Sequence, residues 1–143
     1  METLFVFCDG GARGNPGPAA VGFVVKDRQG KILAQTGRFL GRATNNVAEY
    51  QGVIEALKWI VKNNYQLSII NYQFYLDSKL VVNQLKGLYK IKNASLRLLA
   101  IEVKKLEREA GGQISYHLIP REKNYLADRL VNQVLDKTER GQF

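Results

Sequence analysis

The sequence predicts an α/β fold, a mixed sheet with helices packed on it. Two observations support this class. Short apolar runs bounded by turn residues, which are typical of strands, occur in five places. Longer segments elsewhere in the chain place their apolar residues at helical spacing. The resulting order is β-β-β-α-β-α-α-β-α, which begins antiparallel and continues through helical connections. We expect one domain over residues 1–143, with residues 138–143 a frayed tail.

The first three strands are expected to form an antiparallel unit. Residues 4–8 are almost wholly apolar, as in a strand buried on both faces near the middle of a sheet. Residues 20–26 and 31–40 read as two further strands joined by the turn Asp27-Arg28-Gln29-Gly30.

The period then changes to that of helices. Tyr50, Val53, Ile54, Leu57, Ile60 and Val61 form one stripe of a helix over residues 48–63, with Asn45 or Asn46 as its N-cap. The other predicted elements are a strand over 72–76, a short helix over 79–86, a helix capped by Ser95 and running to 109, a strand over 113–119 and a helix over 124–137.

Charge and cysteine content narrow the class of protein. With 21 Lys and Arg against 13 Asp and Glu, the net charge is +8, which favours binding to polyanions such as nucleic acid. The single cysteine, Cys8, fits a buried position in a reducing compartment. No secretory signal or membrane-spanning run is recognisable, so we expect a cytoplasmic protein.

The stretch "FVFCDGGARGNPGPAAVGFVV" places Asp9 between an apolar run and a glycine-rich loop. Such a loop suits a turn, a phosphate cradle or one part of a metal site. A dinucleotide fingerprint must open into a helix, but here the glycines lead into another strand, and no Gly-Lys-Ser/Thr follows. We therefore expect no nucleotide cofactor.

Three further acids share the setting of Asp9. Asp77 follows the strand "YQFYL", Glu49 lies in the first turn of a helix after "TNN", and Asp128 borders the apolar face of the last helix. Each has a simpler interpretation: Glu49 in a capping box with Asn46, Asp77 as an N-cap, and Asp128 favoured by the helix dipole. Together, carboxylates about 4 Å apart would repel by roughly 4 kcal/mol per pair, which a hard divalent cation relieves.

The segments "FCDGGARGNPGPAAVG", "TNNVAEYQGVIEAL", "FYLDSKLVVNQL" and "PREKNYLADRL" resemble, in order, the four signature segments of type 1 ribonuclease H. The resemblance spans nearly the whole chain. It implies a ribonuclease H-like α/β fold with a mixed five-stranded sheet, the first three strands antiparallel, and helices on both faces. It also implies a monomeric endonuclease that hydrolyses the RNA strand of RNA/DNA hybrids and leaves 5′-phosphate and 3′-hydroxyl ends.

The resemblance assigns roles to individual residues. Asp9, Glu49, Asp77 and Asp128 would be the catalytic acids that hold two Mg²⁺ ions, with Mn²⁺ as a possible substitute and Gly10 beside the metal. By this pattern Asp9 bridges the ions, Glu49 and Asp77 complete the first site and Asp128 the second. The residues expected to contact substrate are Gly11, Arg13, Gly14, Asn15, Arg42, Thr44, Asn45, Asn46, Ser78, Asn93 and Arg121.

Two departures from the family pattern stand out. Many members carry a basic helix and loop between the second and third helices, where this chain has only "KGLYKIKNAS", so affinity would rest on Lys86, Lys90, Lys92 and Arg97. The loop "IPREKN" lacks the histidine that often precedes the last Asp, and Arg121 or Glu122 would have to replace it. The alternatives are a nuclease of the same fold acting on double-stranded RNA or DNA junctions, or a catalytically silent nucleic-acid-binding module.

Overall fold

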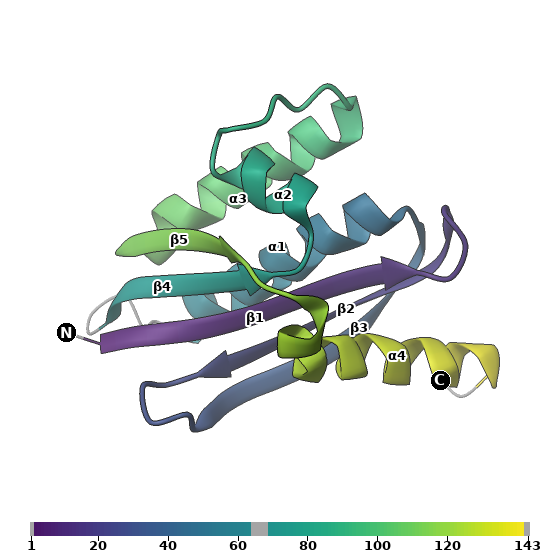
Figure 1. The fold of residues 1–143 in the computed structure, drawn as a ribbon, viewed down its shortest axis with the longest axis horizontal. Helices are drawn as coiled ribbons and strands as arrows, with labels where there is room; N and C mark the ends of the chain where they lie inside the picture. The colour runs from purple at the N-terminus through teal and green to yellow at the C-terminus, as the bar shows by residue number, and fades with distance from the viewer. Residues whose placement is uncertain (1, 64–68, 142–143) are drawn as a thin grey trace.

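A computed structural model describes residues 2–63 and 69–141. In chain order its elements are β1 (Glu2–Ala12), β2 (Gly17–Lys26), β3 (Ile32–Ala43), α1 (Asn45–Asn63), β4 (Ile69–Leu76), α2 (Lys79–Leu85), α3 (Ala94–Ala110), β5 (Gln113–Leu118), the 3₁₀ turn η2 (Arg121–Asn124) and α4 (Tyr125–Glu139) (Figure 1). The predicted order of strands and helices is therefore confirmed.

The strands form one mixed sheet in the order β3-β2-β1-β4-β5. β1 is antiparallel to β2, β2 is antiparallel to β3, and β4 is parallel to both β1 and β5. This matches the expected antiparallel beginning, and the apolar first strand is indeed the central one. β1 extends further than predicted, because its glycine-rich end, Gly10 to Ala12, pairs with Val21 to Ala19 of β2.

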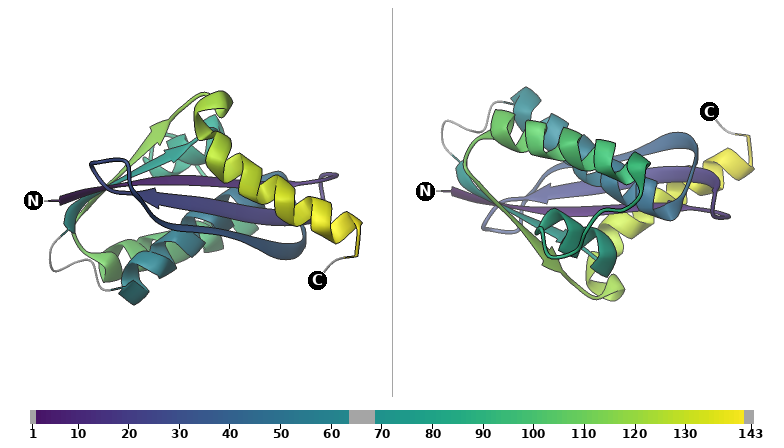
Figure 2. Two further views of the ribbon diagram at one scale, coloured as in Figure 1. Left: turned by 90° about the horizontal axis from the view of Figure 1, so that it is seen from below. Right: turned by 90° about the horizontal axis from the view of Figure 1, so that it is seen from above.

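Helices cover both faces of this sheet, as expected (Figure 2). α1 packs on β1 on one face with α3 outside it, and α4 crosses β2 and β3 on the other. The larger core lies under α1, where Leu4, Val6 and Cys8 of β1 meet Tyr50 and Val53. A smaller cluster of Ala20, Val131 and Leu135 holds α4 to the sheet. Burial of these apolar faces supplies most of the packing free energy.

Glycines let the helices come close to the central strands. A Cβ at Gly10 of β1 would overlap the backbone carbonyl of Ala48 in α1. A Cβ at Gly22 of β2 would lie 2.6 Å from the carbonyl oxygen of Ala127 in α4. Because real Cβ atoms do not approach so closely, each helix can sit at its observed depth only against glycine.

The structure corrects three predictions about helix ends. The cap of α1 is Thr44, whose Oγ1 accepts a hydrogen bond from the Val47 amide, in place of Asn45 or Asn46. The cap of α3 is Asn93 and not Ser95, because the Asn93 side chain accepts from the Leu96 amide. α4 continues to Glu139, so the first residues of the expected tail are helical, and Gln142 and Phe143 lie outside the described residues.

Within the described ranges, none of the helices combines the length and the apolar character that crossing a membrane would need.

Candidate metal and nucleic-acid site

The register of the two central parallel strands brings Asp9 and Asp77 together. The parallel pairing of β1 with β4 ends at Phe7 opposite Tyr75. Asp9 lies two residues after Phe7, and Asp77 lies two residues after Tyr75. Neighbouring strands in a sheet are about 5 Å apart, so residues at equivalent positions beyond the last pair start within reach of each other. This confirms the expectation that the first and fourth strands are neighbours.

Glu49 joins this pair from the first turns of α1. The helix is held close to β1 at Gly10 and again at Gly52, where a Cβ would lie 2.7 Å from the carbonyl oxygen of Asp9. One carboxylate oxygen from each of Asp9, Glu49 and Asp77 lies within 4.8 Å of the other two. Asp9 and Glu49 are buried, and Asp77 is half-buried.

Burial and crowding disfavour the charged forms of these acids. The pKa of Asp9 is raised from 3.8 to about 7, first by burial and then by the charges of Asp77 and Asp128, while its hydrogen bond with Glu49 acts in the opposite direction. The pKa of Glu49 is also raised, again by burial first and then by Asp9. Without a counter-charge the cluster therefore favours holding protons at neutral pH.

The donor set fits a divalent cation. Oε2 of Glu49 is buried and has no hydrogen-bond partner among the described residues. None of the ion pairs found in residues 2–63 and 69–141 neutralises Asp9, Glu49 or Asp77. Carboxylate oxygens that lie close together without a positively charged partner are the ligands that hard ions such as Mg²⁺ prefer. Asp9, Glu49 and Asp77 are accordingly the residues that would hold an ion.

Asp128 lies at the border of this cluster and not within it. It belongs to the first turn of α4 and lines the same pocket of about 460 Å³, but it is outside the group of three mutually close carboxylates. Asp77 does not cap α2, because the Ser78 hydroxyl accepts the hydrogen bond from the Val81 amide. The simpler interpretation of Asp77 as an N-cap is therefore wrong.

The residues expected to contact substrate divide into two groups. Those that line the acid pocket are Gly11, Arg13, Asn45, Asn46, Ser78 and Arg121. Those that lie outside its lining are Gly14, Asn15, Arg42, Thr44 and Asn93. In the second group, Thr44 and Asn93 cap α1 and α3, and the side-chain oxygen of Asn15 accepts a hydrogen bond from the Asn45 amide.

One residue at the site was missed from the sequence. Asn124, the last residue of η2, is 1% exposed, and its Nδ2 donates to the Cys8 carbonyl at 2.8 Å and to Oδ2 of Asp77 at 3.4 Å. It therefore ties the end of β1 to the turn before α4 and orients one acid of the cluster. The only signal in the sequence was its place four residues before Asp128, which gave no reason to expect burial.

A mixed sheet in this order, with three carboxylates converging from β1, α1 and the end of β4, defines the class of ribonuclease H-like folds. The family described as "Reverse transcriptase-like" has a model that matches residues 7–134. The chain belongs to this family, and its relatives and structural neighbours include type 1 ribonuclease H domains.

Two relatives are more than a third identical to this chain over the stretches that align. "Bifunctional protein Rv2228c" of Mycobacterium tuberculosis is 43% identical over 134 residues, which are 93% of this chain and 35% of that protein. "Ribonuclease HI" of Halobacterium salinarum is 38% identical over 93% of this chain and 64% of its own length. The chain thus spans about a third of the mycobacterial proteins it matches.

Among solved structures, LC11-RNase H1 in complex with an RNA/DNA hybrid superposes with a TM-score of 0.90 at 38% sequence identity. The match covers 94% of this chain and 98% of that one. The chain of that enzyme and the present fold therefore correspond over nearly their whole lengths.

Proposed function

We propose that this protein is an endoribonuclease that hydrolyses the RNA strand of RNA/DNA hybrids, leaving 5′-phosphate and 3′-hydroxyl ends. The observation that carries the proposal is the cluster of Asp9, Glu49 and Asp77, each with an oxygen within 4.8 Å of the others. Its relatives named ribonuclease HI and the hybrid complex of LC11-RNase H1 support this choice of substrate.

The acids would hold two Mg²⁺ ions, with Mn²⁺ able to replace them. Asp9 would bridge the two positions, Glu49 and Asp77 would complete one, and Asp128 at the pocket border would serve the other. Divalent ions at such a site supply activation of water and stabilisation of charge on the phosphate and the leaving 3′ oxygen. The chain's own contribution is to fix the carboxylates before substrate arrives, through the β1–β4 register, the depth of α1 and the Asn124 hydrogen bonds.

Recognition of the RNA strand would use polar groups on the pocket wall. Gly11, Asn45 and Asn46 line it beside the acids. The side-chain oxygen of Asn45 is occupied by the Ala12 amide, so its Nδ2 is the group left to donate to a 2′-hydroxyl in the shallow minor groove. Arg121, also in the lining, would meet a phosphate near the reacting bond.

Recognition of the DNA strand would use residues outside the lining of the acid pocket. Arg42 near the end of β3, Thr44 before α1 and Asn93 before α3 are proposed to hold one of its phosphates. Both cap residues use their side-chain oxygens as acceptors, so the Nδ2 of Asn93 and the hydroxyl hydrogen of Thr44 stay available as donors.

A cytoplasmic monomer is the simplest setting for this activity. The four expected acids, Asp9, Glu49, Asp77 and Asp128, line one pocket, so a second copy is not needed to complete the set. Cys8 is a buried free thiol, which suits a reducing compartment.

The test is cleavage of a labelled RNA/DNA hybrid beside double-stranded RNA, a DNA junction, double-stranded DNA and single-stranded RNA, with Mg²⁺, Mn²⁺ or EDTA. We expect metal-dependent cutting of the hybrid's RNA strand that Asp9→Asn abolishes. Asp27→Asn is the matched control, because Asp27 accepts only backbone hydrogen bonds in the β2–β3 turn. Preferred cutting of double-stranded RNA or the junction would contradict the substrate, and tight hybrid binding without cutting would leave a binding module.

A further inference from the structure

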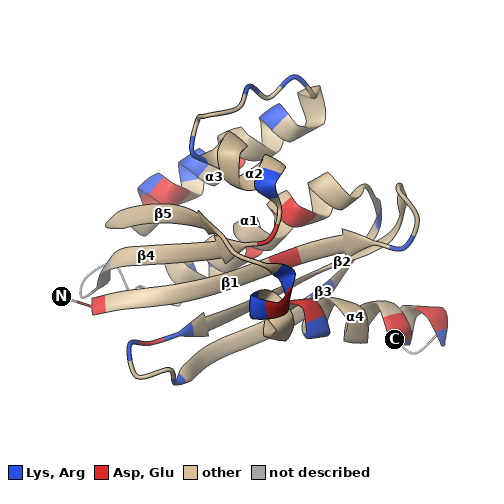
Figure 3. Ribbon diagram, viewed as in Figure 1, with Lys and Arg blue, Asp and Glu red and all other residues tan. Residues whose placement is uncertain are grey.

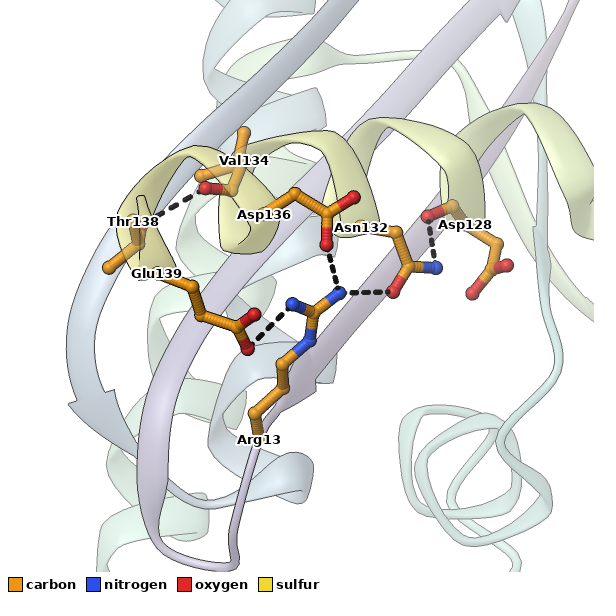
Figure 4. Close-up of polar contacts among 7 residues, drawn as sticks. All are labelled: Arg13, Asp128, Asn132, Val134, Asp136, Thr138 and Glu139. Carbon is orange, nitrogen blue, oxygen red and sulfur yellow. Dashed lines mark hydrogen bonds and ion pairs between the residues drawn. The ribbon is translucent and has the colours of Figure 1, made fainter. Parts of the chain in front are cut away.

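The guanidinium of Arg13 is engaged by the far end of α4 (Figure 4). Its Nη1 lies 2.7 Å from Oε1 of Glu139, and its Nη2 lies 2.8 Å from Oδ1 of Asp136 and 3.3 Å from Oδ1 of Asn132. All three partners are at least 119 residues away in sequence. Arg13 therefore joins the β1–β2 hairpin to the last turns of α4, although the two segments are far apart in the sequence.

The same hairpin has a second anchor on α1. From here on, the glycine-rich loop denotes only residues 12–16, which join β1 to β2 at the tip of the hairpin. The Ala12 amide donates to Oδ1 of Asn45 at 2.9 Å, and the Asn45 amide donates to Oδ1 of Asn15 at 2.9 Å. The loop is thus held from two sides, by hydrogen bonds to the start of α1 and by ion pairs to the end of α4. Both helices also contribute residues to the acid pocket.

The charge of the α4 anchor does not suit a phosphate. Arg13 carries one positive charge, and Asp136 and Glu139 carry two negative ones, so the group is net negative. Both terminal nitrogens of Arg13 already face carboxylates. A phosphate would have to displace them and then sit beside two uncompensated acids.

We propose that Arg13 is a positioning residue, which fixes the glycine-rich loop between α1 and α4 and so sets the width of the pocket mouth for the RNA strand. This inference rests on the proposed function and concerns the same site. Asn132 extends the contact inward, because its Nδ2 donates to the Asp128 backbone carbonyl at 3.0 Å (Figure 4). Asp136 and Glu139 therefore belong to this positioning contact, although they do not line the pocket themselves.

Variants that change the net charge in opposite directions distinguish positioning by Arg13 from direct binding of a phosphate by Arg13. Arg13→Ala is expected to raise KM for the hybrid by about threefold to tenfold and to leave kcat nearly unchanged. The double variant Asp136→Asn/Glu139→Gln makes the protein more positive, which by itself would strengthen polyanion binding, yet positioning predicts the same rise in KM. If Arg13 instead binds phosphate, freeing it from its acids will lower KM, and the proposal is overturned.

Two more variants make the comparison strict. Lys137→Ala is the matched control, since it removes one exposed positive charge from the same turn of α4 outside the Arg13 contacts. We expect its KM to stay close to that of the wild type. In the triple variant the Arg13→Ala effect should not add to that of the double variant, because both remove the same interaction. Full additivity would overturn the inference.

A measurement without substrate keeps this inference separate from the proposed function. Amide hydrogen exchange should be faster at Ala12 and Asn45 in Arg13→Ala and in the carboxylate double variant, and unchanged in Lys137→Ala. Unchanged exchange in Arg13→Ala would refute positioning even if the enzyme is active. Failure of the wild type to cut any hybrid would refute the proposed function, and the exchange result would still decide the role of Arg13.

Discussion

Asn124 shows how a single buried side chain can join the fold to the site. Its Nδ2 satisfies the carbonyl of Cys8 and also reaches Asp77. Asn124→Ala should lower the free energy of unfolding by about 1–3 kcal/mol, because it leaves the buried Cys8 carbonyl without a partner. It should also reduce hybrid cleavage, since Asp77 loses a donor that orients it.

Thermal melting and cleavage assays on Asn124→Ala, Asn124→Asp and Lys123→Ala test this role. Asn124→Asp keeps the volume but places a further acid beside Asp77, so we expect it to impair cleavage at least as much as alanine does. Lys123 is exposed in the same turn, and its loss should change neither measurement appreciably. Wild-type cleavage by Asn124→Ala would contradict the orienting role.

For individual residues, the sequence predicted the positions of the acids better than the contacts that hold those acids in place. Asp9 and Asp77 could be placed together because apolar runs indicate where strands end and which strands pair in parallel. The Arg13 contacts with α4 and the hydrogen bond from Asn124 to the Cys8 carbonyl join residues more than a hundred positions apart, and no local pattern encodes such partners. The helix caps were misassigned by one or two positions because Thr44, Asn45, Asn46, Asn93 and Ser95 are all good capping residues, and packing selects among them.

At the scale of elements, the depth of α4 depends on Gly22 of β2. In Gly22→Ala the new Cβ would lie 2.6 Å from the Ala127 carbonyl oxygen and 2.9 Å from the Leu130 Cβ, so the helix must move outward. We expect a loss of about 1–3 kcal/mol of stability together with reduced cleavage, because Asp128 moves with the helix.

Gly30→Ala is the control that separates a loss of stability from a loss of cleavage. Gly30 has a φ of 81° and nothing within 4 Å of the Cβ position, so alanine there should cost about 1 kcal/mol of backbone strain and leave cleavage intact. Urea unfolding and hybrid cleavage on both variants make the comparison. Equal activity of Gly22→Ala and the wild type would show that α4 depth does not govern the site.

For the whole molecule, the acid cluster makes stability depend on pH when metal is absent. The folded pKa of Asp9 is about 7 against an ordinary 3.8, so the folded state keeps a proton that the unfolded chain releases above pH 4. The resulting stabilisation is present at low pH and is lost as pH rises through about 7. In EDTA, the gap in Tm between Asp9→Asn and the wild type should therefore widen in favour of the variant from pH 5 to pH 8.

Mg²⁺ should reverse that loss, because an ion that binds only the folded state stabilises it. We expect Mg²⁺ to raise the Tm of the wild type at pH 8, and to raise that of Asp9→Asn much less. Differential scanning fluorimetry with and without Mg²⁺ measures both effects. A gap between the two proteins that is independent of pH and of Mg²⁺ would mean that Asp9 is not the charge on which the cluster depends.

The distribution of charge over the molecule also determines how it holds a polyanion. The pocket is acidic, whereas basic residues follow the loop between α2 and α3 and continue onto α3 (Figure 3). Lys90 and Lys92 in this loop are exposed, and the described ion pairs involve neither of them. Positive charge at a distance from the acids can attract the duplex without occupying the metal positions.

Counterion release makes this binding steeply dependent on salt. Lys90→Ala/Lys92→Ala should weaken hybrid binding and reduce the slope of log K against log salt by about 1 for each phosphate that the loop no longer neutralises. Lys31→Ala, in the exposed β2–β3 turn at the other end of the molecule (Figure 1), is the control and should leave the slope unchanged. Fluorescence anisotropy with a labelled hybrid in Ca²⁺ or EDTA measures the slope without cleavage. An unchanged slope in the loop variant would mean that the net charge of +8 acts as a diffuse field and that this loop is not where the duplex binds.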